Sequence, residues 1–536
     1  MEREAPQLGR MPLVSRHRRR TLAWAGLYWA GCLALGLVLV LLRGRPSIDS
    51  DSGIFLSVAA RLLAGDRLYV DVWDNKDPLF YYTFAAALGA GGWRAPFLLD
   101  ALWLAVAAGS AGLLLRALGS SRVTAGAGAL SYPVLLTGAP YYAGYSMLPA
   151  LALAVLAAWL VVRGQLVLPG VLLGLAVLYK ANLALLTISA PLSVVALRWS
   201  TPVRRREVGR LVGGVGATLA GGAAILAARG ELIPYLMVLR ENVSYANDVL
   251  AATRRPSGAY GHLWSVAGLT DHTRQLAIVL GVGAVAALHA LLSRHRPKGN
   301  RLLAALFLVS LVATAMTLAA TAVWDHHLQM LAFPSFLLVG FAASTIELRL
   351  RSRASRLALL VPVVASVLWV AGGLSRPHGL DQGQPWQAQA RSFAALALEK
   401  ARARRFPARS VVSYGVLGSN HEQAHAAFLR GRWRLACPRF HQYPFSQRLD
   451  GVIRCLGVRQ PSLLLLTARF RTVRQPKTSW DRFANQVTGL LDSSYRPLIP
   501  WNRFPGVEVW ELRASRAIEA PSPSRARAAR RRGGVR

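Results

Sequence analysis

Residues 48–82 read IDSDSGIFLSVAARLLAGDRLYVDVWDNKDPLFYY and follow an apolar run at 21–42 that is long enough to cross a membrane. The chain has only 25 acidic residues against 63 Lys and Arg. This one stretch nevertheless holds Asp49, Asp51, Asp66, Asp71, Asp74 and Asp77. A group of carboxylates can bind a divalent metal or take a proton from a hydroxyl. The stretch therefore predicts an acidic site just outside a first membrane helix.

The composition supports a membrane protein. Of 536 residues, 53% are hydrophobic and 16% are charged, whereas a soluble domain carries about 25% charged residues. A net charge of +38 would also suit a nucleic-acid-binding protein. However, the arginines come in bursts between apolar runs, as in membrane proteins, and no zinc-finger, RNP-like or basic-zipper signature accompanies them. We therefore expect no nucleic-acid partner.

The apolar runs predict a polytopic α-helical membrane protein with about eleven spans. They lie at 21–42, 97–115, 123–138, 147–162, 166–179, 182–197, 208–228, 274–293, 302–323, 328–346 and 357–374. Cationic bursts, from Arg16–Arg20 to Arg349–Arg356, fall in alternate loops, so all of them can be cytoplasmic. Residues 1–20 then form a basic cytoplasmic N-terminus, and loop 43–96 is exoplasmic. The first run shows no signal-peptide cleavage site, so we expect it to be retained.

Residues 375–514 are less apolar and predict a small extracytoplasmic domain of α/β or α+β type. RSVVSYGVL, PSLLLLTA and VEVWELR are typical of strands, and NHEQAHAAFL and WDRFANQVTGLL of helices. Residues 515–536 form a basic tail that we expect to be disordered. Outside the cytoplasm Cys437 and Cys455 could form a disulfide. Two unrelated thiols fit the sequence equally well.

The acidic stretch itself predicts two short helices. One helical face suits a helix lying on the membrane surface, and it consists of Ile54, Phe55, Val58, Ala59, Leu62 and Leu63. Gly65 ends that helix, and LFYYTFAAAL begins a second one after proline. Each acid also has a purely structural interpretation, as a helix cap for Asp51 or as a turn residue for the others.

The order of motifs resembles a known family. An acid after the first span, a surface helix, and then G-x-x-x-Y-x-D-x-x-x-x-K-x-P is present here as Gly65, Tyr69, Asp71, Lys76 and Pro78. This pattern resembles the first exoplasmic loop of the GT-C glycosyltransferases. The closest likeness is to the bacterial branch related to protein O-mannosyltransferases and the lipid A aminoarabinose and galacturonic acid transferases. GVLLGLAVLYKANLALL, WDHHLQMLAFPSFLLVGFA and the segment SYGVLGSN…RGRWRLACPRFHQYPF resemble later parts of that branch.

The resemblance implies an enzyme whose multi-span domain covers residues 21–374. It would transfer a sugar from a polyprenyl-phosphate donor to a lipid, glycan or protein acceptor, on the outer side of a bacterial cytoplasmic membrane. Asp51 would be the base or a metal-positioning carboxylate, followed by Asp71 and Asp49 as further catalytic candidates. A divalent metal is the one cofactor expected, with Asp51 as its candidate ligand. The second exoplasmic loop, GAPYYAGYSM, lacks the carboxylate that many family members have there.

Cations are the natural partners of the donor phosphate. Lys180 lies at the outer end of a span, where a charge is costly and often functional, although it could simply snorkel to the interface. Further candidates are Arg254 and Arg255 for the phosphate and Lys76, Tyr69, His326 and His327 for the substrate. A solvated arginine pair and an interfacial aromatic belt are the structural alternatives.

Two other functions fit parts of the sequence. His421-Glu422-Gln423-Ala424-His425 matches the H-E-x-x-H helix of zinc proteases, which would make the chain a membrane-anchored metalloprotease. No third zinc ligand follows at the spacing of the known subclass. A multi-span transporter is the other alternative, but we find no internal repeat of the kind that transporters often show.

Overall fold

The computed structural model describes residues 13–42, 51–138, 144–198, 201–253, 271–293, 295–320, 325–348, 412–417, 433–437, 449–466, 470, 472–476, 479–499 and 508–513. The chain divides into two compact units. The larger unit comprises Met1–Ser47 and Asn75–Gln382, and the smaller comprises Ile48–Asp74 and Gly383–Arg536. The acidic stretch is therefore shared between the units, with the break between Asp74 and Asn75.

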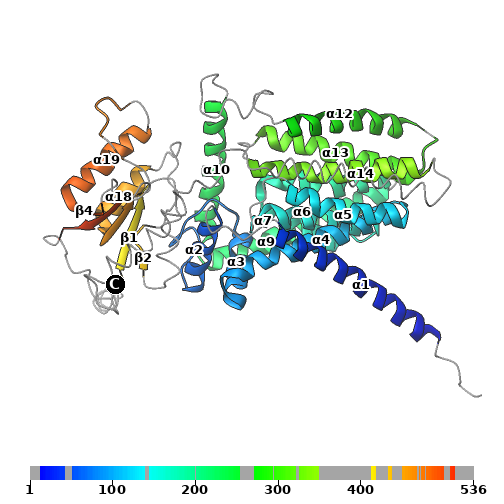
Figure 1. The fold of residues 1–536 in the computed structure, drawn as a ribbon, viewed down its shortest axis with the longest axis horizontal. Coiled ribbons are helices and arrows are strands. Elements are labelled where there is room, and N and C mark those ends of the chain that lie inside the picture. The colour runs from blue at the N-terminus through cyan, green and yellow to red at the C-terminus, as the bar shows by residue number, and fades with distance from the viewer. Residues whose placement is uncertain are drawn as a thin grey trace, which may run out of the picture. The chain divides into compact units, whose positions relative to one another are not determined.

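The described part of the larger unit is helical (Figure 1). Its helices are α1 (Leu13–Leu42), α3 (Pro78–Gly91), α4 (Ala95–Ala117), α5 (Arg122–Gly138), α6 (Met147–Val162), α7 (Val167–Tyr179), α8 (Ala184–Arg198), α9 (Thr201–Ala228), α10 (Leu232–Thr253), α12 (Asp271–Leu292), α13 (Lys298–Ala320) and α14 (Ala332–Glu347), with the short 3₁₀ turns η1 (Gly92–Arg94), η2 (Ala181–Leu183) and η3 (Asp325–Leu331). Figure 1 shows α12, α13 and α14 side by side.

Six helices among the described residues are long and apolar enough to cross a membrane. They contain the segments Trp24–Leu42, Leu98–Ala117, Arg205–Ala228, Gln275–Leu292, Lys298–Ala319 and His327–Glu347. The shorter apolar helices α6, α7 and α8 lie at three further predicted spans. The predicted run at 357–374 lies outside the described residues. A count of eleven spans therefore stays a prediction.

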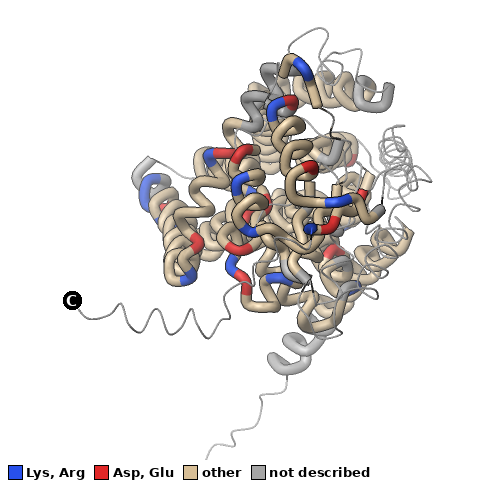
Figure 2. The backbone as a smooth tube through the Cα atoms, turned by 90° about the vertical axis from the view of Figure 1, so that its left-hand side faces the viewer, with Lys and Arg blue, Asp and Glu red and all other residues tan. Residues whose placement is uncertain are grey.

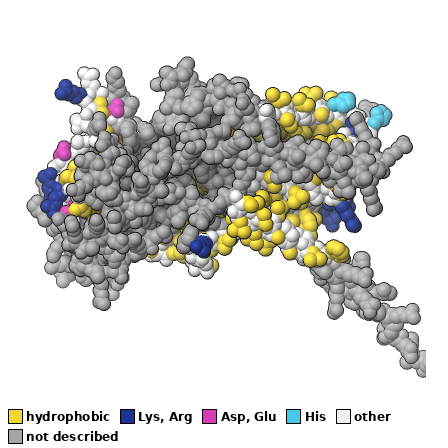
Figure 3. All heavy atoms as spheres, viewed as in Figure 1, with side chains coloured by type: hydrophobic (Ala, Val, Ile, Leu, Met, Phe, Trp, Pro, Cys, Tyr) yellow, Lys and Arg dark blue, Asp and Glu magenta, His cyan; other side chains and the backbone are white. Residues whose placement is uncertain are grey.

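The outer faces of these helices are apolar, as in a membrane domain. On α12, Ile278, Val282, Val285 and Leu292 are each at least 66% exposed. Figure 3 shows hydrophobic side chains gathered over the described helices, with Lys, Arg and His side chains at one end of them. Figure 2 marks the positions of Lys, Arg, Asp and Glu along the described backbone. An apolar surface of this extent marks contact with lipid or protein rather than water.

Glycines bring α7 and α9 into close contact. Gly170 of α7 lies against the backbone of α9, so that a Cβ at Gly170 would be 2.9 Å from the Cα of Gly214 and closer still to the carbonyl oxygen of Leu211. One turn later, Gly174 lies against the side chain of Thr218. Small residues four positions apart allow the backbones of two membrane helices to approach this closely.

The smaller unit contains a five-stranded sheet in the order β2-β1-β3-β5-β4. Its elements are α2 (Asp51–Leu63), β1 (Val412–Leu417), β2 (Trp433–Leu435), α18 (Leu449–Arg459), β3 (Leu463–Leu466), α19 (Ser479–Ser494), β4 (Tyr495–Ile499) and β5 (Glu508–Leu512). Strand β1 is parallel to β2 and β3, whereas β5 is antiparallel to β3 and β4. The predicted helix at NHEQAHAAFL lies outside the described residues.

The core of this sheet lies under α18 and α19. Leu464 and Leu466 of β3 pack with Leu456 of α18 and Phe483 of α19, and all four are buried. Cys437 and Cys455 form a disulfide at the edge of this core, with their Cα atoms 6.0 Å apart. Of the two alternatives that the sequence allows, the structure has the disulfide.

Helix α2 begins at the predicted place but not in the predicted environment. Gly65, at φ +92°, ends it, and the amide of Gly65 donates to the carbonyl of Leu62 over 3.0 Å. Four of the six residues predicted to face the membrane surface, Ile54, Phe55, Val58 and Ala59, are at most 4% exposed, whereas Leu63 is 53% exposed. The expectation that this whole side faces the membrane surface is therefore wrong.

Candidate active site

Asp77 is the centre of a polar cluster in the larger unit. It precedes Pro78, the first residue of α3, and is 8% exposed. Its side chain does not cap α3. Instead, one carboxylate oxygen accepts the backbone N–H of Ala181 at 2.9 Å, and the other accepts the hydroxyl of Tyr235 at 2.8 Å. The carboxylate therefore ties the start of α3 to η2 and to α10.

The break between α7 and η2 explains one of these bonds. The chain leaves helical geometry at Lys180, where φ is −158° and ψ is 85°, and turns again from Ala181. The N–H of Ala181 begins a new turn and so lacks a helical acceptor. Asp77 supplies the acceptor, since a charged oxygen makes a stronger bond to such a donor than a neutral one.

Two lysines surround Asp77. Lys180 is 7% exposed, and the positive charges of Lys180 and Lys76 both act on the Asp77 carboxylate. Burial raises the pKa of the Asp77 carboxyl, against the opposing effects of its two hydrogen bonds and the two lysines. The ammonium of Lys76 also lies 3.0 Å from the side-chain oxygen of Asn75 and 5.9 Å from the ring centre of Tyr145. The charges of two predicted binding residues, 104 positions apart in the chain, thus act on the same carboxylate.

A second buried carboxylate holds the middle of α3. Glu231, in the turn between α9 and α10, has no exposed surface. It accepts the hydroxyl of Tyr82 and, at 2.9 Å, the guanidinium of Arg229. The guanidinium carbon of Arg229 also lies 5.3 Å from the ring centre of Tyr82. Burial raises the pKa of the Tyr82 hydroxyl, and the neighbouring Glu231 raises it further to a smaller extent. The hydroxyl therefore keeps its proton and remains a hydrogen-bond donor.

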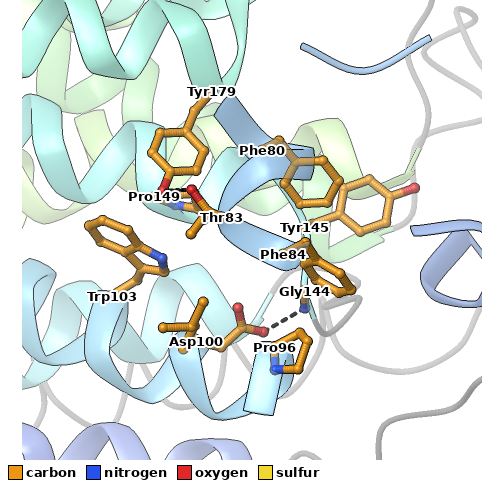
Figure 4. Close-up of a pocket in the computed structure, with 11 residues that line it drawn as sticks. Phe80, Thr83, Phe84, Pro96, Asp100, Trp103, Gly144, Tyr145, Pro149 and Tyr179 are labelled. Carbon is orange, nitrogen blue, oxygen red and sulfur yellow. Dashed lines mark hydrogen bonds between the residues drawn. The ribbon is translucent and has the colours of Figure 1, made fainter. Parts of the chain in front are cut away.

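A small pocket of about 20 Å³ opens beside this cluster (Figure 4). Its aromatic lining comes from several elements: Phe80, Phe84, Trp103, Tyr145 and Tyr179. In Figure 4, Phe80, Phe84 and Tyr145 lie close together, with Trp103 and Tyr179 on the other side of the lining. The rings of Trp103 and Tyr179 meet edge to face, with centres 5.7 Å apart.

Polar groups occupy two places in the same lining. Asp100 of α4 is 2% exposed and accepts the backbone N–H of Gly144 at 2.6 Å. Thr83 of α3 and Tyr179 of α7 bring their hydroxyls within 2.8 Å of each other, and Thr83 donates to the carbonyl of Leu79. The pocket thus combines apolar ring faces with a carboxylate and a pair of hydroxyls.

Other predicted residues lie in the smaller unit. Asp71 is 41% exposed and pairs with Arg67 at 3.0 Å. Tyr69 is 5% exposed and has a φ of +63°, and its N–H donates to the carbonyl of Val72 at 2.6 Å. Asp51 is the first residue of α2, and its side chain is not among the described ones. The roles predicted for these three residues stay predictions.

The remaining candidates are only partly described. His327 is 6% exposed and lies in η3, which also contains the backbone of His326. The predicted residues Asp49, Arg254 and Arg255 and the H-E-x-x-H segment, including Glu422, lie outside the described residues. Within the part of the chain that the structure describes, no group of three or more His, Cys, Asp or Glu side chains could hold a metal ion. The divalent metal at Asp51 stays a prediction.

Several residues of this site were not predicted from the sequence. Asp77 was interpreted as part of a turn, and no role was predicted for Tyr235, Glu231 or Asp100. A signal existed for Asp100, since a carboxylate within an apolar run is expensive and usually functional. Asp77 carried no such signal, because Asp-Pro is common in turns.

Known proteins resemble this chain in fold but not in sequence. The chain matches no protein-family profile and no curated protein. Among solved structures, it resembles the oligosaccharyltransferase of Archaeoglobus fulgidus in its apo form, with a TM-score of 0.52 and 11% identity, over 82% of this chain and 69% of that one. It also resembles the arabinofuranosyltransferase AftD from Mycobacteria, with a TM-score of 0.51 and 14% identity, over 91% of this chain and 40% of that one.

These likenesses show a GT-C-like fold, which confirms the family resemblance at the level of fold. Together with the six apolar helices, they show that the chain is a polytopic helical membrane protein. Sequence identities this low carry no activity from one protein to another, because one fold supports many functions. The function has to be argued from the site.

Proposed function

We propose that this protein transfers a sugar from a polyprenyl-phosphate donor to an acceptor hydroxyl at the outer face of the membrane. The observation that carries the proposal is that buried Asp77 follows Lys76 directly and binds Ala181, the residue after Lys180, within a GT-C-like membrane domain, so that both lysine charges act on its carboxylate. A phosphate that leaves from a sugar needs positive charge nearby as its bond breaks. Two ammonium groups from separate segments provide that charge.

Asp77 positions these lysines rather than acting as a base. Both of its oxygens already accept hydrogen bonds from groups fixed in the fold. Its negative charge offsets the cost of placing a buried ammonium at Lys180. When the donor phosphate arrives, the lysines gain a second anionic partner without having to be brought together.

The base is assigned from the sequence. Asp51 is our first choice, with Asp71 and Asp49 behind it. The carboxylate takes the proton of the acceptor hydroxyl, and the acceptor oxygen attacks the anomeric carbon. The bond between that carbon and the phosphate oxygen breaks, polyprenyl phosphate leaves, and the anomeric configuration inverts. His326 and His327 remain candidates for contact with the sugar, and Arg254 and Arg255 for the phosphate.

The outer face is favoured by two observations. The Cys437–Cys455 disulfide suits a compartment outside the cytoplasm. The cationic bursts of the sequence place the segments that contain Lys76 and Lys180 on the side opposite to the positive loops. We propose the bacterial cytoplasmic membrane as the location, with a lipid, glycan or protein as acceptor.

The test is sugar transfer in membranes that contain the full chain, with a labelled panel of polyprenyl-phosphate sugars. We expect transfer from at least one donor. Asp51→Asn should lower the rate by about 10²–10⁴-fold, which is the usual contribution of a positioned base. Lys180→Ala should lower it by about tenfold or more, the loss expected for a charged hydrogen bond.

Lys298→Ala is the matched control, because Lys298 is an exposed lysine at the start of α13. It should transfer at the wild-type rate. Transfer that survives Asp51→Asn would move the base to another residue. Absence of transfer from every donor, with peptide cleavage that Glu422→Gln abolishes, would replace this proposal with the protease.

A further inference from the structure

We propose that helix α10 lies along the outer surface of the membrane and contacts phospholipid through one face. That face, which we call the α10 apolar face, consists of Ile233, Leu236, Met237, Arg240 and Val243. The inference concerns the lipid around the protein and not the sugar donor, so it goes beyond the proposed transfer and does not require it. All of its residues belong to the larger unit.

The α10 apolar face is a single exposed stripe. Its positions recur at the spacing that places side chains on one side of a helix. The side chains of Ile233 and Val243 are 66% and 63% exposed, and those of Leu236 and Met237 are 49% and 41% exposed. A contiguous apolar surface of this kind marks contact with lipid or protein rather than with water.

The opposite side of α10 is fixed to the segment that contains Lys76. Tyr235 donates to the carboxylate of Asp77 over 2.8 Å. Asn242, two helical turns later, donates its side-chain N–H to the carbonyl of Asn75 over 2.9 Å. Val238, on the same side of the helix, is 1% exposed. These contacts hold α10 in one rotation about its axis, so the apolar face points away from residues 75–77.

The turn before α10 changes the direction of the chain. Helix α9 ends at Gly230, which has a φ of +71°. The N–H of Glu231 donates to the carbonyl of Leu226 over 2.7 Å, and that of Gly230 to Ala227 over 2.9 Å, which is the usual glycine-terminated end of a helix. In Figure 1, α10 runs across the direction of α12, α13 and α14, at the end of these helices away from the turn between α12 and α13. A helix that runs across membrane spans lies along the membrane plane.

The lipid-facing surface of α9 continues into α10. Helix α9 contains the apolar segment Arg205–Ala228, and its last turn has Ile225 at 63% exposure. The cations Arg204–Arg206 at the start of α9 predict a cytoplasmic start, so its last turn reaches the outer surface. Ile233, in the first turn of α10, begins the apolar face there. The two exposed surfaces thus follow each other at the level where a span ends.

Arg240 favours the membrane surface over the membrane interior. It is exposed and belongs to the α10 apolar face. An arginine within the hydrocarbon core is costly. At the surface its aliphatic part can cover hydrocarbon, while its guanidinium binds a lipid phosphate. A second copy of the chain, packed symmetrically on this face, would instead bring a like charge to it. Phospholipid is therefore the partner that complements both the apolar residues and the cation.

The test is the membrane depth of fluorescent labels on the full chain in phosphatidylcholine vesicles. Cys437 and Cys455 form a disulfide, so Cys32→Ala removes the one free thiol of the three cysteines. In this background, Leu236→Cys or Val243→Cys carries an NBD label. The vesicles contain lipids with a nitroxide quencher at the headgroup, at a shallow position or deep in the acyl chain. We expect the headgroup and shallow quenchers to remove more fluorescence than the deep one. Both labels should have the same depth, whereas an upright helix would separate them by about 10 Å.

Val282→Cys and Val458→Cys are matched controls, since both replace an exposed valine of a helix. Val282 is 66% exposed and lies in the middle of α12, and Val458 is 78% exposed and lies in α18 of the smaller unit. The deep quencher should act most strongly on the label at Val282, as expected within a span. Every quencher should act less on the label at Val458 than on the label at Val243.

Three results would overturn the inference. Labels at Leu236 and Val243 that no quencher affects would remove lipid from the α10 apolar face. Depths that differ by about 10 Å would show that α10 stands upright in the membrane. Oxidative cross-linking of two chains through Leu236→Cys, in place of quenching, would assign the face to a second copy. Equal, shallow depths in a protein that transfers no sugar from any donor would leave this inference standing and would reject the proposed function alone.

Discussion

The hydroxyl of Tyr235 donates to the carboxylate of Asp77 over 2.8 Å and joins residues that lie 158 positions apart. Burial and the charge of Asp77 raise the pKa of this hydroxyl, so it keeps its proton. The bond fixes the first residues of α3 to the first turn of α10. It is a charged hydrogen bond in a buried place, which is the kind whose loss is most costly.

Removal of this donor should therefore weaken the protein. We expect Tyr235→Phe to lower the free energy of unfolding by about 1.5–3 kcal/mol, as measured by denaturant unfolding in detergent. Tyr28→Phe is the comparison, since the hydroxyl of Tyr28 donates to the neutral carbonyl of Gly109 at 2.8 Å. It should cost about 0.5–1.5 kcal/mol. An equal cost for both variants would show that the Asp77 carboxylate adds nothing to the bond.

Asp77 should also contribute a pH-dependent term to stability. Since burial raises the pKa of its carboxyl, the folded protein holds this proton to higher pH than the unfolded chain does. The stabilisation is then fully present below the unfolded pKa of about 3.9, and it is lost as pH rises through the folded pKa.

The comparison that isolates this term is wild type against Asp77→Asn. We expect the stability of wild type relative to the variant to fall as the pH rises above about 4, with thermal unfolding as the measurement. A relative stability that rises over the same range would mean that Lys76 and Lys180 outweigh burial and lower the pKa.

The sequence predicted those parts of this site whose signal is local. Lys180 stood out because it is a charge at the end of an apolar run, and Lys76 because it belongs to a motif with Tyr69 and Asp71. The helix after Pro78 and the glycine that ends α2 followed from neighbouring residues. The GT-C-like fold was recognisable from the order of these motifs.

The role of Asp77 was out of reach for the opposite reason. Its partners Ala181 and Tyr235 are far away in the chain, and no local pattern connects them. The resemblance also directed attention to a carboxylate in the second loop, which this chain lacks. Asp100, from α4, accepts the N–H of Gly144 in that loop, but a single sequence does not show which helix faces which loop.

Glu231 and Tyr82 should behave as a coupled pair. Tyr82→Phe removes one donor from a fully buried carboxylate, and Glu231→Gln removes the charge that also binds Arg229. We expect each single variant to cost about 1–3 kcal/mol in unfolding free energy, and the double variant to cost less than their sum by about 0.5 kcal/mol or more. Simple additivity in this double-mutant cycle would contradict a shared interaction.

The contact between α7 and α9 should tolerate no side chain. Gly170→Ala places a Cβ against the backbone of Gly214 and Leu211, so the helices must separate, and overpacking of this kind costs about 1–3 kcal/mol. Gly216→Ala, on the same helix pair but with nothing within 4 Å of its Cβ, should be neutral or stabilising by up to about 1 kcal/mol. Thermal unfolding of both variants makes the comparison. A destabilising Gly216→Ala would remove the argument from close approach.

This glycine contact also has a mechanical consequence. Backbones that touch leave no side chain between them to absorb a displacement, so α7 and α9 move as one piece. Lys180 ends α7, and the turn that carries Glu231 follows α9. Glu231 accepts a hydrogen bond from Tyr82 of α3. Asp77, just before α3, accepts one from Ala181, just after Lys180. Contacts thus join the three helices in a closed circuit. The backbone therefore fixes the spacing of the two segments that carry Lys76 and Lys180 before a lipid binds.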